Sequence, residues 1–246
     1  MKTLGLQLYT VRSLLTNEDE INRTLKTVKE IGYDSVQLFG SVELIENCSK
    51  SALAVGLDVI GVLVDMNFCE SHELELFEIC KKYNIPDIGI SSSPQEYQDP
   101  DAYITRVHKF ADKVKAQGFG FSYHNHGHEF IRLSDGRTAM SHFLEKFDPE
   151  KILFMPDTYW LHDGGYDVRY FLEQTKGRVK ILHLKDLKRL EQGHTYAEIG
   201  NGNLCFEEIL KTAKNCGIEQ FVVEQDVCPG NPIDSISLSF NYLKTL

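Results

Sequence analysis

The chain has 246 residues, of which 42% are hydrophobic and 25% are charged, and its formal net charge is −10. These values are typical of a globular protein, and the length fits one barrel-sized domain spanning residues 1–246. The scattered Lys and Arg residues exclude an extended basic surface, so we expect no nucleic acid partner. No apolar run reaches the roughly 18 residues of a membrane span, so we expect no membrane partner either.

The sequence also indicates a compartment. The first ten residues, MKTLGLQLYT, lack the apolar run and small-residue cleavage site of a secretory signal. The six cysteines form no C-x-x-C pair, and most stand in apolar or helical surroundings, where a free thiol behaves as a small hydrophobic group. We therefore expect a cytoplasmic protein whose fold needs no disulfide.

Eight short β-like runs recur along the chain, and longer stretches with helical spacing separate them. The predicted strands are, in chain order, 4–10, 34–39, 57–64, 87–92, 120–125, 152–157, 179–186 and 220–226. The clearest helical stretches are 18–32, 71–84, 101–118 and 203–217. The first of these ends at Gly32, a plausible C-terminal cap.

Strands that alternate with helices of about 10–15 residues indicate βαβ units and a parallel sheet. Eight such units in about 250 residues are the count of a (β/α)₈ TIM barrel, so we predict an α/β fold of this type in a single domain. The rival architecture is an open doubly wound sheet. No glycine-rich phosphate fingerprint follows the first predicted strand, which disfavours the dinucleotide-binding form of that rival.

Ionisable side chains stand at the C-terminal ends of three consecutive predicted strands, where the active sites of such barrels lie. Alternate residues of strands six, seven and eight are apolar until the series ends in Asp157, in His183 with Lys185, and in Glu224. If the barrel closes, these side chains converge on one point. Such a mixed oxygen and nitrogen set suits one divalent metal ion, either Mn, Zn, Co or Mg.

Some polar residues near the strand ends have a simpler interpretation. A single charged residue there is usually a helix cap or a solvated turn, and we expect Asp186 and Asp226 to be of this kind. Gly200 and Gly202 of EIGNGN predict a tight loop before a helix. Such a loop is able to approach a phosphate group, although a single G-x-G is weak evidence for it.

Six motifs of the chain resemble those of the xylose isomerase-like TIM barrels, the group of sugar phosphate isomerases and epimerases that also includes inosose dehydratases and ketose 3-epimerases. The motifs are LGLQLYTVR, YHNHGHEF, PDTYW, HLKD, EIGNGNLCFEEIL and VVEQD. The likeness runs from residue 4 to about residue 226. It implies one divalent metal ion held by Glu, Asp, His and Glu from successive strands, and Asp157, His183 and Glu224 carry over as three of these ligands.

The segment FSYHNHGHEF, residues 121–130, departs from the pattern of the relatives. Where many of them present the first glutamate ligand, this chain reads His124, Asn125, His126. We expect Glu129, a few residues further on, to reach back to the metal as the fourth ligand. His126 is the alternative ligand.

The resemblance implies removal of a proton next to a carbonyl, with a metal-stabilised enediolate. Glu224 and His126 are the candidate bases, and we expect Lys185 to donate a hydrogen bond to the developing oxyanion. The side chains that we expect to contact the substrate are His124, Trp160, His162, Tyr9 and Gln37.

We therefore predict a metal-dependent isomerase or epimerase of a sugar or sugar phosphate. The alternative enzyme is a lyase that dehydrates an inosose or a 3-keto sugar. An endonuclease IV-like DNA repair enzyme would need a basic groove, and a non-catalytic sugar-binding barrel would not require Asp157, His183 and Glu224 together. The expected partner is a small-molecule sugar, and a homo-oligomer is compatible with the sequence.

Overall fold

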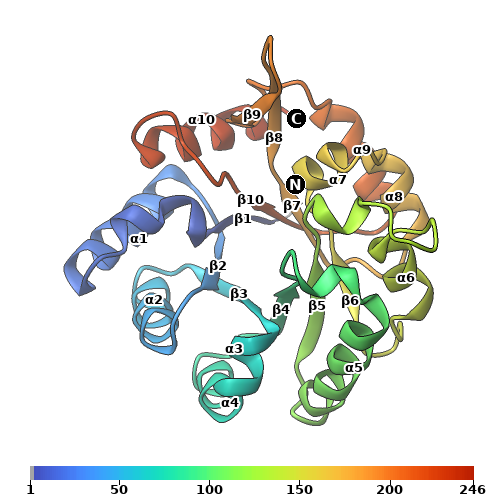
Figure 1. The fold of residues 1–246 in the computed structure, drawn as a ribbon. Coiled ribbons are helices and arrows are strands. Elements are labelled where there is room, and N and C mark those ends of the chain that lie inside the picture. Colours follow the sequence, from blue (N-terminus) through green and yellow to red (C-terminus); the bar gives the residue numbers. More distant parts are fainter. Residues whose placement is uncertain (1–2) are drawn as a thin grey trace.

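The computed structural model describes residues 3–246 and shows a central ring of strands surrounded by helices (Figure 1). Its main sheet has eight strands, which pair in parallel in the order β6-β5-β4-β3-β2-β1-β10-β7. Parallel bridges from Phe154 to Val179 and from Asp157 to His183 bring β7 beside β6, so the strands form a nearly closed barrel. The strands are β1 (Thr3–Gln7), β2 (Ser35–Phe39), β3 (Asp58–Asp65), β4 (Asp87–Ser91), β5 (Gly120–His124), β6 (Leu153–Met155), β7 (Ile181–Leu184) and β10 (Gln220–Val223).

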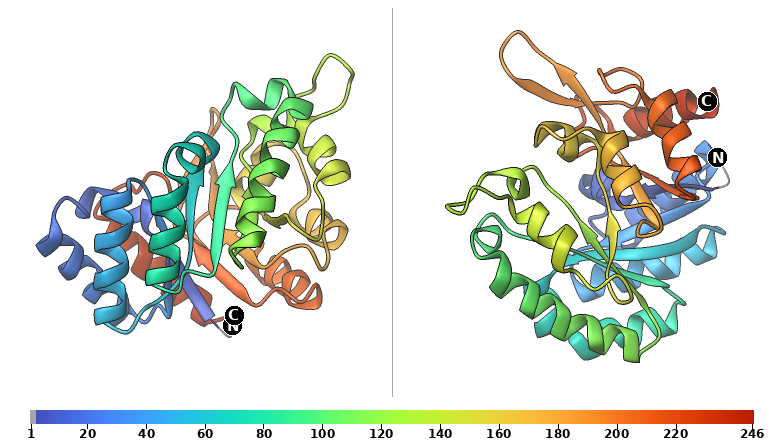
Figure 2. Two further views of the ribbon diagram at one scale, coloured as in Figure 1. Left: turned by 90° about the horizontal axis from the view of Figure 1, so that it is seen from below. Right: turned by 90° about the vertical axis from the view of Figure 1, so that its right-hand side faces the viewer.

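Helices connect the strands and cover the outside of the barrel (Figures 1 and 2). Across residues 3–246, no helix combines the length and the apolar character needed to cross a membrane. The α-helices are α1 (Glu18–Ile31), α2 (Val42–Ala54), α3 (Met66–Ser71), α4 (Glu73–Lys82), α5 (Pro100–Ala116), α6 (Ala139–Lys146), α7 (Thr158–Asp163), α8 (Val168–Gln174), α9 (Phe206–Asn215) and α10 (Pro232–Lys244). Three 3-10 helices are η1 (Leu8–Leu14), η2 (Glu96–Gln98) and η3 (His128–Phe130).

The local sequence explains where α1 begins and ends. The side chain of Asn17 accepts a hydrogen bond of 3.0 Å from the backbone N–H of Glu20, which caps the first turn. The helix ends at Gly32, whose φ of 117° is unfavourable for a residue with a Cβ atom. Leu25 and Val28 lie on its buried face, as the apolar spacing predicts.

The predicted TIM barrel is confirmed, and each predicted strand overlaps a strand of the main sheet. The first strand ends earlier than the predicted range 4–10, because the chain leaves the sheet after Gln7 and forms η1. An antiparallel hairpin of β8 (Asp186–Arg189) and β9 (His194–Ala197) follows β7 and was not predicted. In Figures 1 and 2 this hairpin projects beyond the ring of helices.

Apolar side chains fill the barrel interior beneath its C-terminal end. Ile60, Met155, Ile181 and Val222 come from four different strands and form one buried cluster. A filled interior of this kind is a packed core and leaves no channel through the barrel. The polar side chains of the strands therefore meet only above this layer, at the mouth that faces the viewer in Figure 1.

Candidate metal centre and active site

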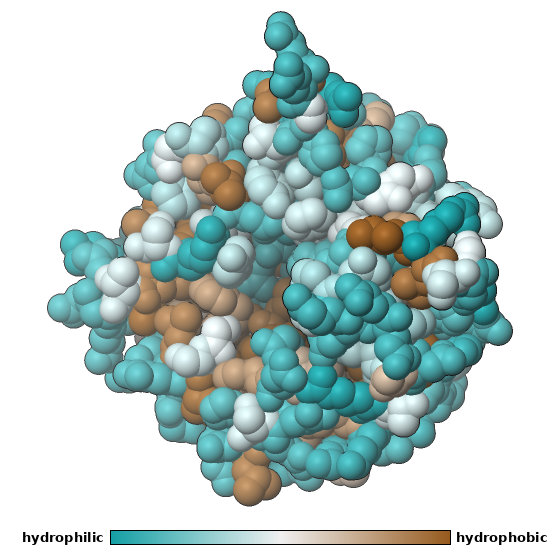
Figure 3. Space-filling view, viewed as in Figure 1, coloured by the Kyte–Doolittle hydropathy of each residue, from teal (hydrophilic) through white to brown (hydrophobic). Residues whose placement is uncertain are grey.

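A cavity of about 440 Å³ opens at the C-terminal ends of the barrel strands. It lies in the central hollow of the face shown in Figure 3. Its volume falls within the range of about 300–1,000 Å³ that is usual for small-ligand sites. The charged and imidazole side chains that line it are Asp65, His124, His126, Lys185, Glu224 and Asp226.

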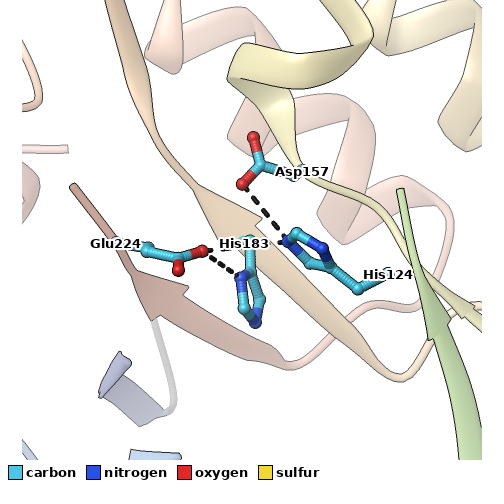
Figure 4. Close-up of side chains that lie close together, drawn as sticks. All are labelled: His124, Asp157, His183 and Glu224. Carbon is cyan, nitrogen blue, oxygen red and sulfur yellow. Dashed lines mark hydrogen bonds and ion pairs between the residues drawn. The ribbon is translucent and has the colours of Figure 1, made fainter. Parts of the chain in front are cut away.

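Four buried side chains form a compact group (Figure 4), and two of them, His124 and Glu224, line this cavity. The four are His124, Asp157, His183 and Glu224, and they offer ligand atoms that all lie within 4.8 Å of one another. Nδ1 of His183 lies 2.8 Å from Oε2 of Glu224, and Nε2 of His124 lies 3.4 Å from Oδ2 of Asp157. We call these four residues the ligand group.

The ends of four strands position the ligand group. His124 is the last residue of β5 and His183 lies within β7. Glu224 follows β10 directly, and Asp157 follows β6 after one intervening proline. Asp157 has two roles, because its Oδ1 accepts a hydrogen bond from the backbone N–H of Trp160 and so caps α7, while its Oδ2 faces His124. The side chain that caps α7 is thus also a member of the ligand group.

Lys185 enters the same group from the end of β7. Its side chain is 1% exposed, and its Nζ lies 3.0 Å from Oδ2 of Asp157 and 3.2 Å from Oε2 of Glu224. Nζ also lies 2.9 Å from Oδ1 of Asp226. Three carboxylates therefore surround one ammonium, and the group carries more negative than positive charge.

The surroundings shift the pKa values of these charged residues. Burial alone would lower the pKa of Lys185, but Asp157, Glu224 and Asp226 outweigh it and raise the pKa well above its ordinary value. Burial would raise the pKa of Glu224, but the Lys185 ammonium and the hydrogen bond to His183 hold it well below the ordinary value. The pKa of Asp157 is lowered in the same way, since Lys185 and His124 outweigh its burial. Both carboxylates and the ammonium are therefore charged at neutral pH.

The ligand group has the properties that a divalent metal ion requires. Both ring nitrogens of His124 are buried without a hydrogen-bond partner among residues 3–246, and Nε2 faces the Asp157 carboxylate only at 3.4 Å. Buried polar atoms rarely remain without a partner, and the group offers imidazole nitrogens together with carboxylate oxygens. This donor set fits Zn²⁺, Mn²⁺ or Co²⁺, and its carboxylates also suit Mg²⁺.

Gln37 contacts the ring nitrogen of His183 that does not face Glu224. Its Oε1 lies 2.7 Å from Nε2 of His183 and accepts a second hydrogen bond, of 2.9 Å, from Nε2 of Gln7. A proton on Nε2 of His183 satisfies this contact and leaves the lone pair of Nδ1 for a cation, as is usual for histidine ligands of metals. Gln37 is fully buried and lies outside the cavity lining, so it contacts His183 and is not among the lining residues where we had expected a substrate contact.

We had expected Glu129 to reach the ligand group, but in the structure it lies outside that group. After His124 the strand ends and the chain turns into η3, which holds the buried Glu129 carboxylate against other partners. The Tyr123 hydroxyl donates to its Oε1 at 2.6 Å, the Ser92 hydroxyl donates to the same atom at 2.9 Å, and the backbone N–H of His126 donates to Oε2 at 2.8 Å. His124 lies at the position that we had assigned to Glu129.

His126 lines the cavity next to the ligand group, and its ring centroid is 5.2 Å from that of His124. Its Nδ1 is buried and has no hydrogen-bond partner in the described part of the chain. Burial, together with the charges of His124 and Lys185, holds its pKa well below the ordinary value. His126 and Glu129 belong, with His128, to a second group of ligand-type atoms beside the first.

The remaining predicted substrate contacts divide into two kinds. Tyr9 lines the cavity, and Trp160 lies beside it, with its ring 5.4 Å from both the His126 centroid and Nζ of Lys185. His162 is exposed and lines a different surface depression, next to Asn203 and Glu208, so it is not brought to the site. Its place on α7 is consistent with this, because Thr158, Tyr159 and Leu161 are the buried residues of that helix and His162 lies on its exposed side.

The EIGNGN loop does not present its backbone N–H groups to a ligand. Those of Gly200 and Gly202 each donate 3.0 Å hydrogen bonds to Oδ2 of Asp186, and that of Leu204 donates to Oδ1 at 3.2 Å. The Asp186 carboxylate thus occupies the place of an anion, which removes the basis for a phosphate site here.

Asp226 is a site residue that our sequence reasoning set aside as a turn or cap residue. It lines the cavity and pairs with Lys185. The signal for it was present, because Asp226 follows Glu224 by two residues and alternation places both on one strand face.

The comparisons with known proteins agree with this architecture. The chain is 23% identical over 163 residues to the inosose dehydratase of Geobacillus thermodenitrificans. The matched region is 58% of this chain and 53% of that protein, so the match covers only about half of the relative's length. A sugar phosphate isomerase/epimerase from Parabacteroides distasonis superposes with a TM-score of 0.83 at 22% identity, covering 99% of this chain and 93% of the other. A 3-keto-D-glucoside 4-epimerase from E. coli superposes with a TM-score of 0.72 at 14% identity, covering all of both chains.

At these identities the solved structures show the fold and not the activity. The family described as xylose isomerase-like TIM barrel matches residues 25–246, which is most of the chain. The chain therefore belongs to the xylose isomerase-like TIM barrel family.

Proposed function

We propose that the protein is a divalent-metal-dependent isomerase or epimerase that removes the proton α to the carbonyl of a small sugar. The observation that carries this proposal is the buried ligand group at the cavity, directly beside an unpartnered imidazole and a buried lysine. The family and the similar proteins are enzymes that isomerise, epimerise or dehydrate, which supports this general class of chemistry.

His124, Asp157, His183 and Glu224 are the residues that would hold the metal ion. When bound, a divalent cation supplies a Lewis acid that polarises a substrate carbonyl and makes the neighbouring proton more acidic. Mn, Zn, Co and Mg are the candidates, because the donor set admits each of them.

His126 is the proposed base. Its Nδ1 has no partner within residues 3–246, and its ring lines the cavity beside the ligand group. Glu224, our other candidate, is less suited to take a proton, because its Oε2 already faces Nδ1 of His183 and Nζ of Lys185. The geometry thus favours His126 for proton transfer and leaves Glu224 as a ligand.

Lys185 is the proposed electrostatic partner of the developing oxyanion. Three carboxylates keep its ammonium charged and fixed at the base of the cavity. A fixed positive charge of this kind stabilises an enediolate without reorganisation during the reaction.

Dehydration is the second candidate function. Inosose dehydratases are among the relatives that match part of this chain in sequence, and the cavity contains a base, His126, beside a fixed ammonium, Lys185, that would stabilise the charge developing during an elimination. Elimination and epimerisation share the first proton transfer and differ in what leaves afterwards. A DNA repair function is disfavoured, because among the described residues that line the cavity Lys185 is the one cation, and it is already paired with carboxylates and so is not free to bind a phosphodiester.

Metal analysis and isotope exchange test the proposal together. The purified protein should contain close to one divalent ion per chain, and Asp157→Ala should lose it. Asp112→Ala should retain the metal, because Asp112 is a surface carboxylate that pairs with Lys151. Wild-type protein without bound or bindable metal would reject both the isomerase and the dehydratase functions.

The second arm incubates the loaded protein with keto sugars in D₂O and follows the products by NMR. Deuterium at the α-carbon with retention of all hydroxyls supports isomerisation or epimerisation, whereas loss of water supports dehydration. His126→Ala should lower the exchange rate by about 10²–10⁴-fold while retaining metal.

A further inference from the structure

The cavity has two chemically different sides, and the proposed function uses only one of them. The polar side comes from β5, β7 and the end of β10. The opposite side comes from the C-terminal ends of β2 and β3 and from η1 and α3. It consists of five residues that we call the apolar wall: Tyr9, Phe39, Leu63, Val64 and Phe68. Figure 3 shows hydrophobic surface running into the central hollow on the side of β2 and β3.

The rings of the apolar wall are fixed in position but only partly covered by protein. Tyr9 is 38% exposed and packs edge-on against the half-buried Phe39, with 5.3 Å between the ring centroids. The guanidinium of Arg12 covers the Tyr9 ring at 4.0 Å, and the half-buried Phe68 stacks on His72. Partly exposed apolar surface inside a cavity is a favourable binding place for an apolar group of a ligand.

The same cavity is poorly suited to a phosphate group. Lys185 is the one cation among the described residues that line it, and its ammonium is already paired with three carboxylates. Asp65, at the end of β3, places a further carboxylate beside the apolar wall. Phosphate sites normally offer free Arg or Lys side chains without competing carboxylates, and the nearby Arg12 guanidinium is turned onto the Tyr9 ring and donates to the Tyr9 carbonyl. The side chains that line the cavity therefore offer a phosphate dianion no unpaired cation.

We propose that the substrate is an unphosphorylated keto sugar that carries an aromatic substituent, such as the aglycone of an aryl glycoside, and that the apolar wall binds this substituent. The inference rests on the proposed function for the position of the sugar, whose carbonyl faces the ligand group. The substituent then extends across the cavity towards Phe68 and Tyr9. The polar side selects the sugar, and the apolar wall selects what is attached to it.

Binding measurements test this inference without requiring turnover. Isothermal titration calorimetry uses the 3-keto forms of phenyl β-D-glucoside and methyl β-D-glucoside, so that the carbonyl that faces the ligand group is present, together with glucose 6-phosphate. We expect phenyl glucoside to bind the wild-type protein about tenfold more tightly than methyl glucoside, and glucose 6-phosphate to bind most weakly. Phe68→Ala and Tyr9→Ala should each remove most of the phenyl advantage, measured as the ratio of the affinities for phenyl and methyl glucoside. Tyr170→Ala, at an exposed aromatic residue on α8, should change none of these affinities.

Several results would overturn the inference. Equal affinity for the phenyl and methyl glucosides, or no detectable binding of phenyl glucoside, would show that the wall has no such ligand. Weaker binding of methyl glucoside to Phe68→Ala and Tyr9→Ala, in proportion to phenyl glucoside, would show that the wall stacks on the sugar itself. Tightest binding of glucose 6-phosphate would identify a phosphorylated substrate. The isotope exchange assay is independent of the binding measurements. Selective binding of phenyl glucoside without isotope exchange would therefore reject only the proposed function.

Discussion

The ammonium nitrogen of Lys185 lies 3.0 Å from Oδ2 of Asp157, inside the group of residues that we propose as metal ligands. It is also within 3.2 Å of Glu224 and 2.9 Å of Asp226. Buried charges of opposite sign stabilise the fold only together, because each alone is costly to remove from water. Lys185 therefore supplies the counter-charge of the carboxylates whenever no cation is bound between them.

Replacing this lysine should destabilise the metal-free protein. Lys185→Met leaves three carboxylates without their ammonium, and breaking a buried ion pair typically costs about 3–5 kcal/mol. Added Mn²⁺ should recover part of this loss, since it returns positive charge to the group. Urea unfolding with EDTA and with Mn²⁺ measures both effects. Lys188→Met, at an exposed position of β8, is the matched control and should change little. Equal stability of the two variants in EDTA would contradict the role of Lys185.

His124 and Glu129 should behave differently when replaced. His124→Ala removes a member of the ligand group and should lower bound metal to a small fraction of that in the wild-type protein. Glu129→Gln should retain the metal but lower the exchange rate about tenfold or more, because one of the two carboxylate acceptors becomes a donor, while the Tyr123 and Ser92 hydroxyls and the His126 backbone N–H all donate to them. Metal analysis beside the exchange assay separates the two cases. Loss of metal in Glu129→Gln would restore the assignment made from sequence.

Gln37 should tune metal affinity without contacting the substrate. Gln37→Leu removes the acceptor at Nε2 of His183, and loss of such a supporting partner usually weakens metal binding about 10–100-fold. Competition with a fluorescent chelator measures the affinity, and circular dichroism checks that the fold persists. Gln98→Leu, at an exposed position in η2, should leave the affinity unchanged. An unchanged affinity in Gln37→Leu would show that the amide does not orient the imidazole.

Asp87 should make folding stability depend on pH. It is fully buried at the start of β4, and burial raises its pKa to about 6. The protonated carboxyl is favoured in the folded state, so its contribution is fully present below about pH 4 and is lost as the pH rises through 6. Relative to Asp87→Asn, the wild-type protein should therefore lose up to about 3 kcal/mol of stability between pH 4 and pH 7. Urea unfolding of both proteins across this range provides the measurement, and parallel pH profiles would contradict the expectation.

The fold was predictable because its pattern is repeated and local. Each βα unit carries its own signals, such as the Gly32 cap of α1, and eight of them in a row indicate the barrel. The β8–β9 hairpin was not predicted, because the segment between the buried Leu187 and the buried Ala197 is largely polar and shows no apolar alternation. The end of β1 at Gln7 was missed because apolar residues continue into η1.

The candidate site was only partly predictable. Alternation along β6, β7 and β10 identified Asp157, His183 and Glu224, since strand ends in a barrel converge by geometry. The choice between His124 and Glu129 depends on where β5 ends and how η3 turns, and neither follows from composition. The apolar wall was missed entirely, because its residues come from four separate elements and look like ordinary core residues in the sequence.

The cap that Asp157 forms on α7 has a consequence for the entropy that is lost when a cation binds. One carboxylate oxygen is held by the backbone of the helix, so rotation of this side chain is frozen when the chain folds. The entropy of ordering it is lost then and not when a cation arrives, which is the meaning of preorganisation. Helix α7 therefore fixes the orientation of the Asp157 carboxylate before any cation binds to the ligand group.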